Sequence, residues 1–316
     1  MKICILGGSG FIGGHFLNHL SRCGIQAVVP TRNPGARSAG RVAPGVSYPT
    51  IDIFDPEQLE AVVQGCQAVV NLVGILNESA RDGSGFQRAH VALVEAALAA
   101  CQKTGIHRFI QMSALNAGTG DSHYLRSKGD AELRLRQASL EWTILRPSVV
   151  FGPGDKFLNR FAFLLRLGQG FMPLACPNAR MQPVFVGDVA AALTRVLLDP
   201  LASAGQVYEL AGPRVYTLAE LVRYTRDQLG LPGPVIGLPA GLSKLQAALL
   251  QWVPGKPFSP DNYRSLQFDS VSDSKDLERL GITATTLEAV APRYLGGDNR
   301  AGHHQQSRRL AGRDAS

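Results

Sequence analysis

Three glycines at a spacing of three follow directly after a short apolar run at the start of the chain. Ile3 to Leu6 contains only apolar residues, which is typical of a strand buried on both faces of a sheet. Gly7 would allow a sharp turn into a helix, Gly10 a close approach of backbone to a pyrophosphate, and Gly13 tight packing of helix on strand. The pattern predicts a dinucleotide-binding turn at a helix N-terminus, with an ordinary turn as the alternative.

The rest of the sequence up to about residue 155 alternates between strand and helix patterns. Strands are predicted at 3–6, 26–30, within 46–53, and at 68–73, 107–112 and 142–145. Helices are predicted from Ile12, from Asp55-Pro56, over 86–104 and over 122–137. This order predicts an α/β fold, a Rossmann-type doubly wound parallel sheet.

Beyond residue 155 the alternation loosens and prolines cluster, which predicts a smaller C-terminal substrate domain. We expect residues 1–155 to form mainly the nucleotide-binding domain, with strand and helix returns near 182–212, and residues 156–295 to form mainly the smaller domain. The polar segment 296–316 is predicted to be a disordered tail.

Composition excludes several classes of protein. The sequence has no run of about eighteen apolar residues, so no membrane span is predicted. It begins with a strand rather than a signal peptide, and its five cysteines are scattered, which favours reduced thiols and a cytoplasmic protein. The net charge of +7 comes without a basic face interleaved with aromatics, so nucleic acid is not an expected partner.

The residue after the second strand indicates which nucleotide is preferred. A Rossmann site that binds NAD often has an acidic residue about 20 positions past the glycines. This chain has Arg32 there, and a guanidinium can pair with a 2′-phosphate, so NADP(H) is expected in preference to NAD(H). Asp52 follows the third strand near the expected adenine edge, and Gly74 follows the fourth, where backbone must pass close to the cofactor. A surface arginine is the alternative for Arg32.

Three polar residues predict carbonyl chemistry. Ser113 ends the fifth strand, and Tyr124 and Lys128 lie one helical turn apart. A phenol can give a proton to the alkoxide left by hydride transfer, and a nearby ammonium would lower its pKa. Ser113 is predicted to orient the carbonyl oxygen.

These motifs together resemble the short-chain dehydrogenase/reductase superfamily over about residues 1–295. Within it the chain is similar to the atypical extended branch that includes the 39 kDa accessory subunit of respiratory complex I. The stretch from Leu145 to Asp155 is the most specific part of the match. The resemblance implies a Rossmann core, NADP(H) binding, and a carbonyl or quinone-related substrate in ubiquinone or respiratory metabolism. The residues expected to bind the cofactor are Gly7, Ser9, Gly10, Phe11, Ile12, Gly13, Arg32, Asp52, Ile53, Val73, Gly74, Tyr124, Lys128 and Pro147.

One position departs from the family pattern. Many active members carry an asparagine that holds a proton-relay water, where this chain has His90. Two functions therefore stay open, an oxidoreductase and a subunit that holds NADP(H) without turnover in a respiratory or quinone-synthesis complex.

Two further features have alternative interpretations. His15 and His19 lie one turn apart, but without a third ligand we predict no metal site. The segments 156–172 and 242–253 mix apolar and basic residues. They are interpreted as core helices, or as an apolar surface with a basic rim, including Lys156 and Lys244, that holds the protein peripherally on the inner face of a membrane. The oligomeric state is not predicted.

Overall fold

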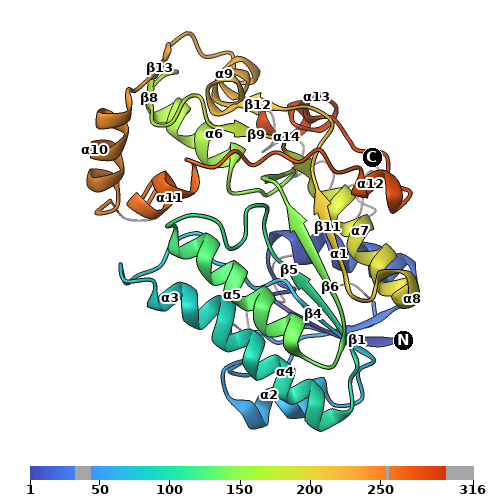
Figure 1. The fold of residues 1–316 in the computed structure, drawn as a ribbon. Helices are drawn as coiled ribbons and strands as arrows, with labels where there is room; N and C mark the ends of the chain where they lie inside the picture. Colours follow the sequence, from blue (N-terminus) through green and yellow to red (C-terminus); the bar gives the residue numbers. More distant parts are fainter. Residues whose placement is uncertain (33–43, 254–255, 297–316) are drawn as a thin grey trace, which may run out of the picture.

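A seven-stranded parallel sheet forms the centre of the computed structural model, which describes residues 1–32, 44–253 and 256–296 (Figure 1). The strands run in the order β3-β2-β1-β4-β5-β6-β11, and each is parallel to its neighbours. Their bounds are β1 Lys2–Leu6, β2 Gln26–Val28, β3 Val46–Ser47, β4 Ala68–Asn71, β5 Arg108–Met112, β6 Glu141–Pro147 and β11 Gln206–Leu210. This confirms the predicted Rossmann-type sheet.

Helices cover both faces of this sheet, as the alternating side chains of β1 illustrate. Ile3 and Ile5 pack in one core with α1 Phe11–Arg22 and α7 Val186–Leu198. Cys4 and Leu6 pack in the other core with α2 Pro56–Val63, α4 Leu93–Thr104 and α5 His123–Gln137. Both faces of β1 are therefore buried, as its continuous apolar sequence predicts.

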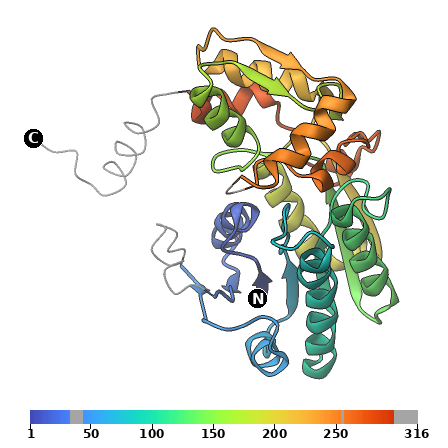
Figure 2. The same ribbon diagram turned by 90° about the vertical axis from the view of Figure 1, so that its left-hand side faces the viewer.

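A third core belongs to the smaller part of the molecule, which lies beyond the carboxyl ends of the strands (Figures 1 and 2). It includes α6 Leu158–Leu167, α9 Leu218–Gln228, α13 Leu287–Val290 and α14 Pro292–Leu295. Three two-stranded pairs accompany it: β7 Val150–Phe151 with β10 Val184–Phe185, β8 Met172–Leu174 with β13 Val235–Gly237, and β9 Arg180–Met181 with β12 Tyr216–Thr217.

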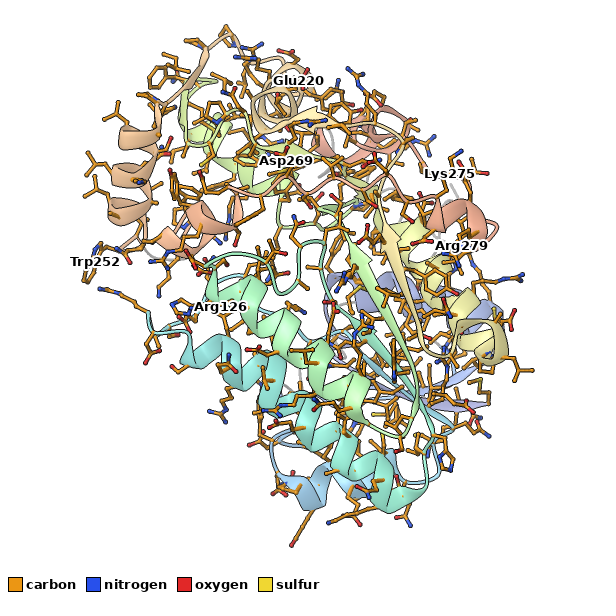
Figure 3. All side chains as sticks on the ribbon, in the orientation of Figure 1. Arg126, Glu220, Trp252, Asp269, Lys275 and Arg279 are labelled. Carbon is orange, nitrogen blue, oxygen red and sulfur yellow. The ribbon has the colours of Figure 1, made fainter. Side chains whose placement is uncertain are left out.

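The remaining helices are short or lie at the surface. They are α3 Ser84–Phe86, α8 Pro200–Ser203, α10 Ala240–Leu250, α11 Pro260–Ser265 and α12 Asp276–Arg279. Trp252, just after α10, lies at the outer edge of the molecule (Figure 3). Among the described residues, no helix has the length and apolar character needed to cross a bilayer.

Several element boundaries differ from the predictions. The third strand is only two residues long, and an isolated parallel bridge between Thr31 and Thr50 follows it. The helix predicted over 86–104 begins with a π-helical turn, η2 Gln87–Ala92, before α4. The segment 276–295 forms three short helices, α12, α13 and α14. The predicted tail lies outside the described residues from residue 297 on.

Candidate active site

The glycine turn between β1 and α1 leaves space that side chains would fill. Gly7 has φ +77°, and a Cβ there would lie 2.9 Å from the backbone nitrogen of Val73. A Cβ on Gly13 would overlap the carbonyl oxygen of Gly8. The first turn of α1 has no side-chain cap at Gly10 and no acidic residue. Its amides and dipole end are thus available to a phosphate, and the turn suits a dinucleotide.

The other predicted cofactor residues lie at the same edge of the sheet. Arg32 is exposed just past β2, and Pro147 ends β6. The backbone amide of Val73 donates to Asn71 Oδ1 at 3.1 Å, which fixes the turn that leads to Gly74. Asp52 accepts a bond from the backbone amide of Phe54 at 3.0 Å, so its carboxylate stabilises its own turn.

Tyr124 and Lys128 lie one turn apart on α5; Lys128 is buried and Tyr124 is partly buried. The ring of Tyr124 packs edge-on against Phe86 and His90, with centroids 6.0 and 5.6 Å apart. Lys128 Nζ donates to the carbonyl of Met112 at 3.1 Å, and a Cβ on Gly74 would be 3.3 Å from it. The structure therefore places Lys128 beside the turn where the cofactor is expected.

Burial changes the pKa of both groups. It raises the pKa of Tyr124 to about 12, since phenolate loses water. It lowers the pKa of Lys128 to about 8, with the negative charge of Glu132 acting in the opposite direction. The lowered phenol pKa that the sequence suggested is not found; in this structure burial decides the direction.

Ser113 does not join this pair. Its hydroxyl donates to Glu132 Oε1 at 2.6 Å, one turn further along α5. Glu132 is almost fully buried and also accepts two bonds from Arg146, at 2.9 and 2.6 Å. The structure thus places Tyr124 and Lys128 one turn apart on α5 and gives Ser113 a separate partner. Glu132 was missed from the sequence, although an acid four residues after Lys128 on a buried helix face is a visible signal.

His90 makes hydrogen bonds with both ring nitrogens. The backbone amide of Ile75 donates to Nε2 at 3.2 Å, so Nε2 is the acceptor and Nδ1 carries the hydrogen. Nδ1 then donates to Ser127 Oγ at 2.8 Å, and that hydroxyl donates to the carbonyl of Tyr124. Burial, and secondarily Lys128, lowers the pKa of His90 to about 2. His90 therefore ties the turn after β4 to α5 as a neutral imidazole.

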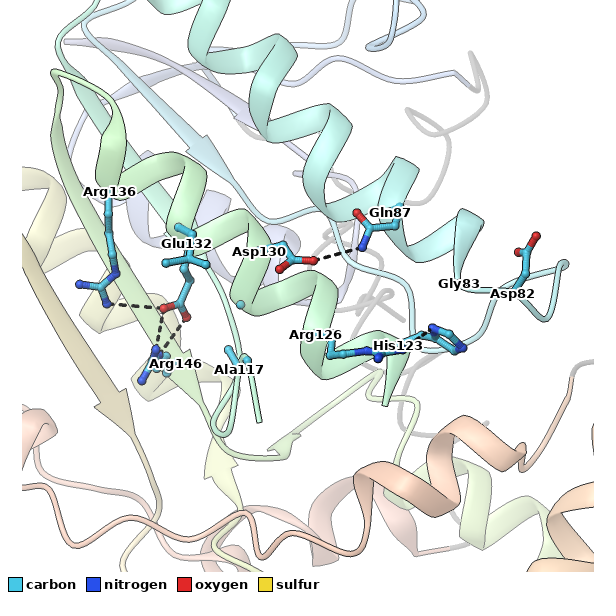
Figure 4. Close-up of a pocket in the computed structure, with 13 residues that line it drawn as sticks. Asp82, Gly83, Gln87, Ala117, His123, Arg126, Asp130, Glu132, Arg136 and Arg146 are labelled. Atoms are coloured by element: carbon cyan, nitrogen blue, oxygen red, sulfur yellow. Dashed lines mark hydrogen bonds and ion pairs between the residues drawn. The ribbon is translucent and has the colours of Figure 1, made fainter. Parts of the chain in front are cut away.

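A polar cavity of about 690 Å³ lies on the opposite face of α5 (Figure 4). Its lining includes Arg126, Arg136 and Arg146, together with Asp130 and Glu132. Glu132 pairs with Arg136 and Arg146, while Asp130 accepts from Gln87, as the dashed lines in Figure 4 mark. Neither Tyr124 nor Lys128 lines this cavity.

Comparison with known proteins places the chain among nucleotide-binding proteins. Residues 7–155 match a family model described as NAD(P)H-binding. The chain is 32% identical over 281 residues to the Arabidopsis thaliana protein named NADH dehydrogenase (ubiquinone) 1 alpha subcomplex subunit 9, mitochondrial, covering 85% of this chain and 68% of that protein. It is 28% identical over 239 residues to a ceramide reductase of Caulobacter vibrioides, covering 75% and 73%.

Solved structures share the fold. A UDP-glucose 4-epimerase of Thermotoga maritima superposes with a TM-score of 0.74 at 19% identity, covering 93% of this chain and 97% of that one.

Proposed function

Because the chain belongs to the NAD(P)H-binding family of short-chain dehydrogenase/reductase proteins that includes subunit 9 of the NADH dehydrogenase alpha subcomplex, we propose that it is an NADP(H)-dependent reductase of a carbonyl or quinone-related compound. The observation that carries the proposal is the placement of Tyr124 one helical turn before the buried Lys128, whose Nζ lies beside Gly74. The relative named as a reductase supports turnover.

The preference for NADP(H) rests on Arg32. Its exposed side chain follows β2, where a Rossmann site meets the adenosine ribose. A guanidinium there would pair with the 2′-phosphate of NADPH, whereas NADH has only a hydroxyl. Arg32→Asp should reverse the preference. Fluorescence titration with both cofactors measures it, and equal affinities in the unmodified protein would refute the proposal.

In the proposed reaction bound NADPH supplies a hydride to the carbonyl carbon, and the protein supplies the proton. Tyr124 holds that proton on its hydroxyl and gives it to the carbonyl oxygen. Lys128, when charged, stabilises the phenolate that results. Tyr124→Phe should abolish NADPH oxidation by carbonyl or quinone substrates while NADPH binding persists. Full activity in that variant would show that another group donates the proton.

A second candidate function is a subunit that holds NADP(H) without turnover in a respiratory or quinone-synthesis complex. The relatives named as NADH dehydrogenase subunits favour it. The two functions differ in one measurement. A reductase oxidises NADPH when offered soluble quinone or carbonyl compounds, whereas a structural subunit binds NADPH and leaves it unchanged.

We further propose that the smaller domain attaches peripherally to an anionic membrane surface. Among the described residues, most of the large exposed apolar side chains come from two segments: Phe163, Leu167 and Phe171, and Ile236, Leu242, Leu245, Leu249, Trp252 and Val253. The pairing of β8 with β13 joins these segments. Residues 156–187 and 228–260 contain no acidic residue and six basic ones. This combination favours contact with anionic lipid, each basic group adding about 1 kcal/mol.

Co-sedimentation with vesicles containing anionic lipid tests this attachment. Leu249, which is 61% exposed on α10, should weaken binding when changed to Glu. The matched control is Leu201→Glu, because Leu201 is 95% exposed on α8 and outside both segments. Absence of binding at low salt, or equal binding by both variants, would refute the attachment.

A further inference from the structure

One segment of the smaller domain crosses the edge of the sheet where the candidate active site lies. This crossing segment, residues 259–272, begins at α11 and runs toward β11 (Figure 1). Phe268 packs on Gly120, where a Cβ would overlap its ring. Further along, the carbonyl of Asp269 accepts from Asn116 Nδ2 at 2.8 Å, and that of Ser270 accepts from Ser148 Oγ at 2.7 Å. The segment thus contacts the loops that follow β5 and β6.

Asp261 makes the contact closest to Tyr124. Its Oδ1 accepts from the backbone amide of His123 at 2.7 Å, and its Oδ2 accepts from the backbone amide of Tyr124 at 3.2 Å. Oδ2 also accepts from Ser122 Oγ at 3.0 Å, and Ser122 Oγ lies 2.7 Å from Ser265 Oγ. Asp261 is 9% exposed, so these donors replace the water that its carboxylate lacks.

This carboxylate supplies what α5 itself does not have. The first turn of α5 contains no acidic residue, and its own cap is the neutral Ser122, which accepts from the amide of Leu125 at 3.3 Å. A negative charge at this end satisfies orphan amides and complements the helix dipole. Here the charge comes from α11, more than a hundred residues later in the chain.

We propose that Asp261 is a positioning residue, which fixes the turn of α5 that carries Tyr124 and so sets the phenol against the bound substrate. The proposal rests on the proposed reductase function. Since the bond is to the amide of Tyr124 itself, its loss should shift the phenol directly. A displacement of about 1 Å at a reacting group can cost about a hundredfold in rate.

Asp261→Asn tests the proposal, with Asp269→Asn as the matched control. Asp269 lies in the same crossing segment, but its carboxylate accepts from the backbone of Arg180, away from α5. Asp261→Asn should lower kcat by about ten- to a hundredfold and leave KM and NADPH affinity nearly unchanged. Asp269→Asn should leave all three unchanged. Unchanged kcat in Asp261→Asn, or an equal loss in both variants, would overturn the proposal.

Amide hydrogen exchange separates a failure of this proposal from a failure of the reductase function. In the NADPH-bound protein, Asp261→Asn should speed exchange at His123 and Tyr124 and leave the second half of α5 unchanged. If the unmodified protein oxidises no NADPH, the reductase function fails, and this exchange result alone decides whether Asp261 fixes the turn. Unchanged exchange, or faster exchange along the whole helix, would overturn it. Asp261→Ser, which retains one acceptor, replaces Asp261→Asn if that variant does not fold.

Discussion

Replacing Lys128 by Met should make the cofactor-free protein more stable at neutral pH. Burial lowers the pKa of Lys128 from 10.5 to about 8, with Glu132 opposing the change. This lowering corresponds to a penalty of about 3 kcal/mol for holding the charged side chain in the folded state. Met has a similar volume and no charge, so the penalty disappears. The variant also loses the bond from Nζ to the carbonyl of Met112, which costs about 1 kcal/mol.

The net expectation is a gain of about 2 kcal/mol in the free energy of unfolding at pH 7. Its pH dependence has a definite sign. Below pH 8 the lysine is charged in both states, so the whole penalty is present in the unmodified protein. Between pH 8 and 10.5 the folded lysine has lost its proton while the unfolded one keeps it, so the penalty declines. The advantage of the variant should therefore shrink across that window.

Urea unfolding of both proteins at pH 7 and pH 9.5 measures the effect, with Lys103→Met as the control for an exposed lysine. A less stable Lys128→Met variant at pH 7, or a difference that grows with pH, would refute the reasoning. The same variant should bind NADPH more weakly, because Lys128 lies beside Gly74 at the expected cofactor position.

Other substitutions test separate parts of the structure. Gly13→Ala should abolish NADPH binding in a fluorescence titration and cost about 1–3 kcal/mol of stability, since its Cβ overlaps backbone; Gly241→Ala, with open space around it, should be tolerated. Between pH 5 and 8 the activity of His90→Gln should depend on pH as that of the unmodified protein does, because the buried imidazole, with a pKa of about 2, is already neutral there. An inflection near pH 6.5 that is present in the unmodified protein and absent from the variant would contradict this. Tyr294→Phe removes a 2.7 Å bond to the buried Asp155 carboxylate and should cost about 1–3 kcal/mol in urea unfolding without changing NADPH affinity.

The sheet and the cofactor turn could be predicted because their signals are local. The apolar run of β1, the glycines after it, and the spacing of Tyr124 and Lys128 each lie within a few residues. A local pattern fixes local geometry, so the helix that carries both residues appears where the sequence placed it.

The rest of the site depends on residues that are distant in sequence. Ser113 was assigned to the substrate because it directly follows β5, but its partner is Glu132, whose position depends on how α5 packs on the sheet. Asp261 was not predicted at all, because nothing near it in sequence indicates that it caps α5. The raised pKa of Tyr124 likewise follows from the loss of water around its ring in the folded protein, which the spacing of residues in the sequence does not indicate.

The late position of the crossing segment in the sequence also bears on the order in which the protein folds during synthesis. The last strand of the sheet ends at Leu210, well before Asp261 in the sequence. Asp261 itself lies 137 positions after Tyr124. A nascent chain that extends to Leu210 therefore contains every strand of the sheet and the glycine turn between β1 and α1, while the first turn of α5 still lacks the carboxylate of Asp261. Contacts between residues so distant in sequence form late in folding, because the long chain between them must be ordered first. We therefore expect the sheet to form before the contact between Asp261 and the amide of Tyr124.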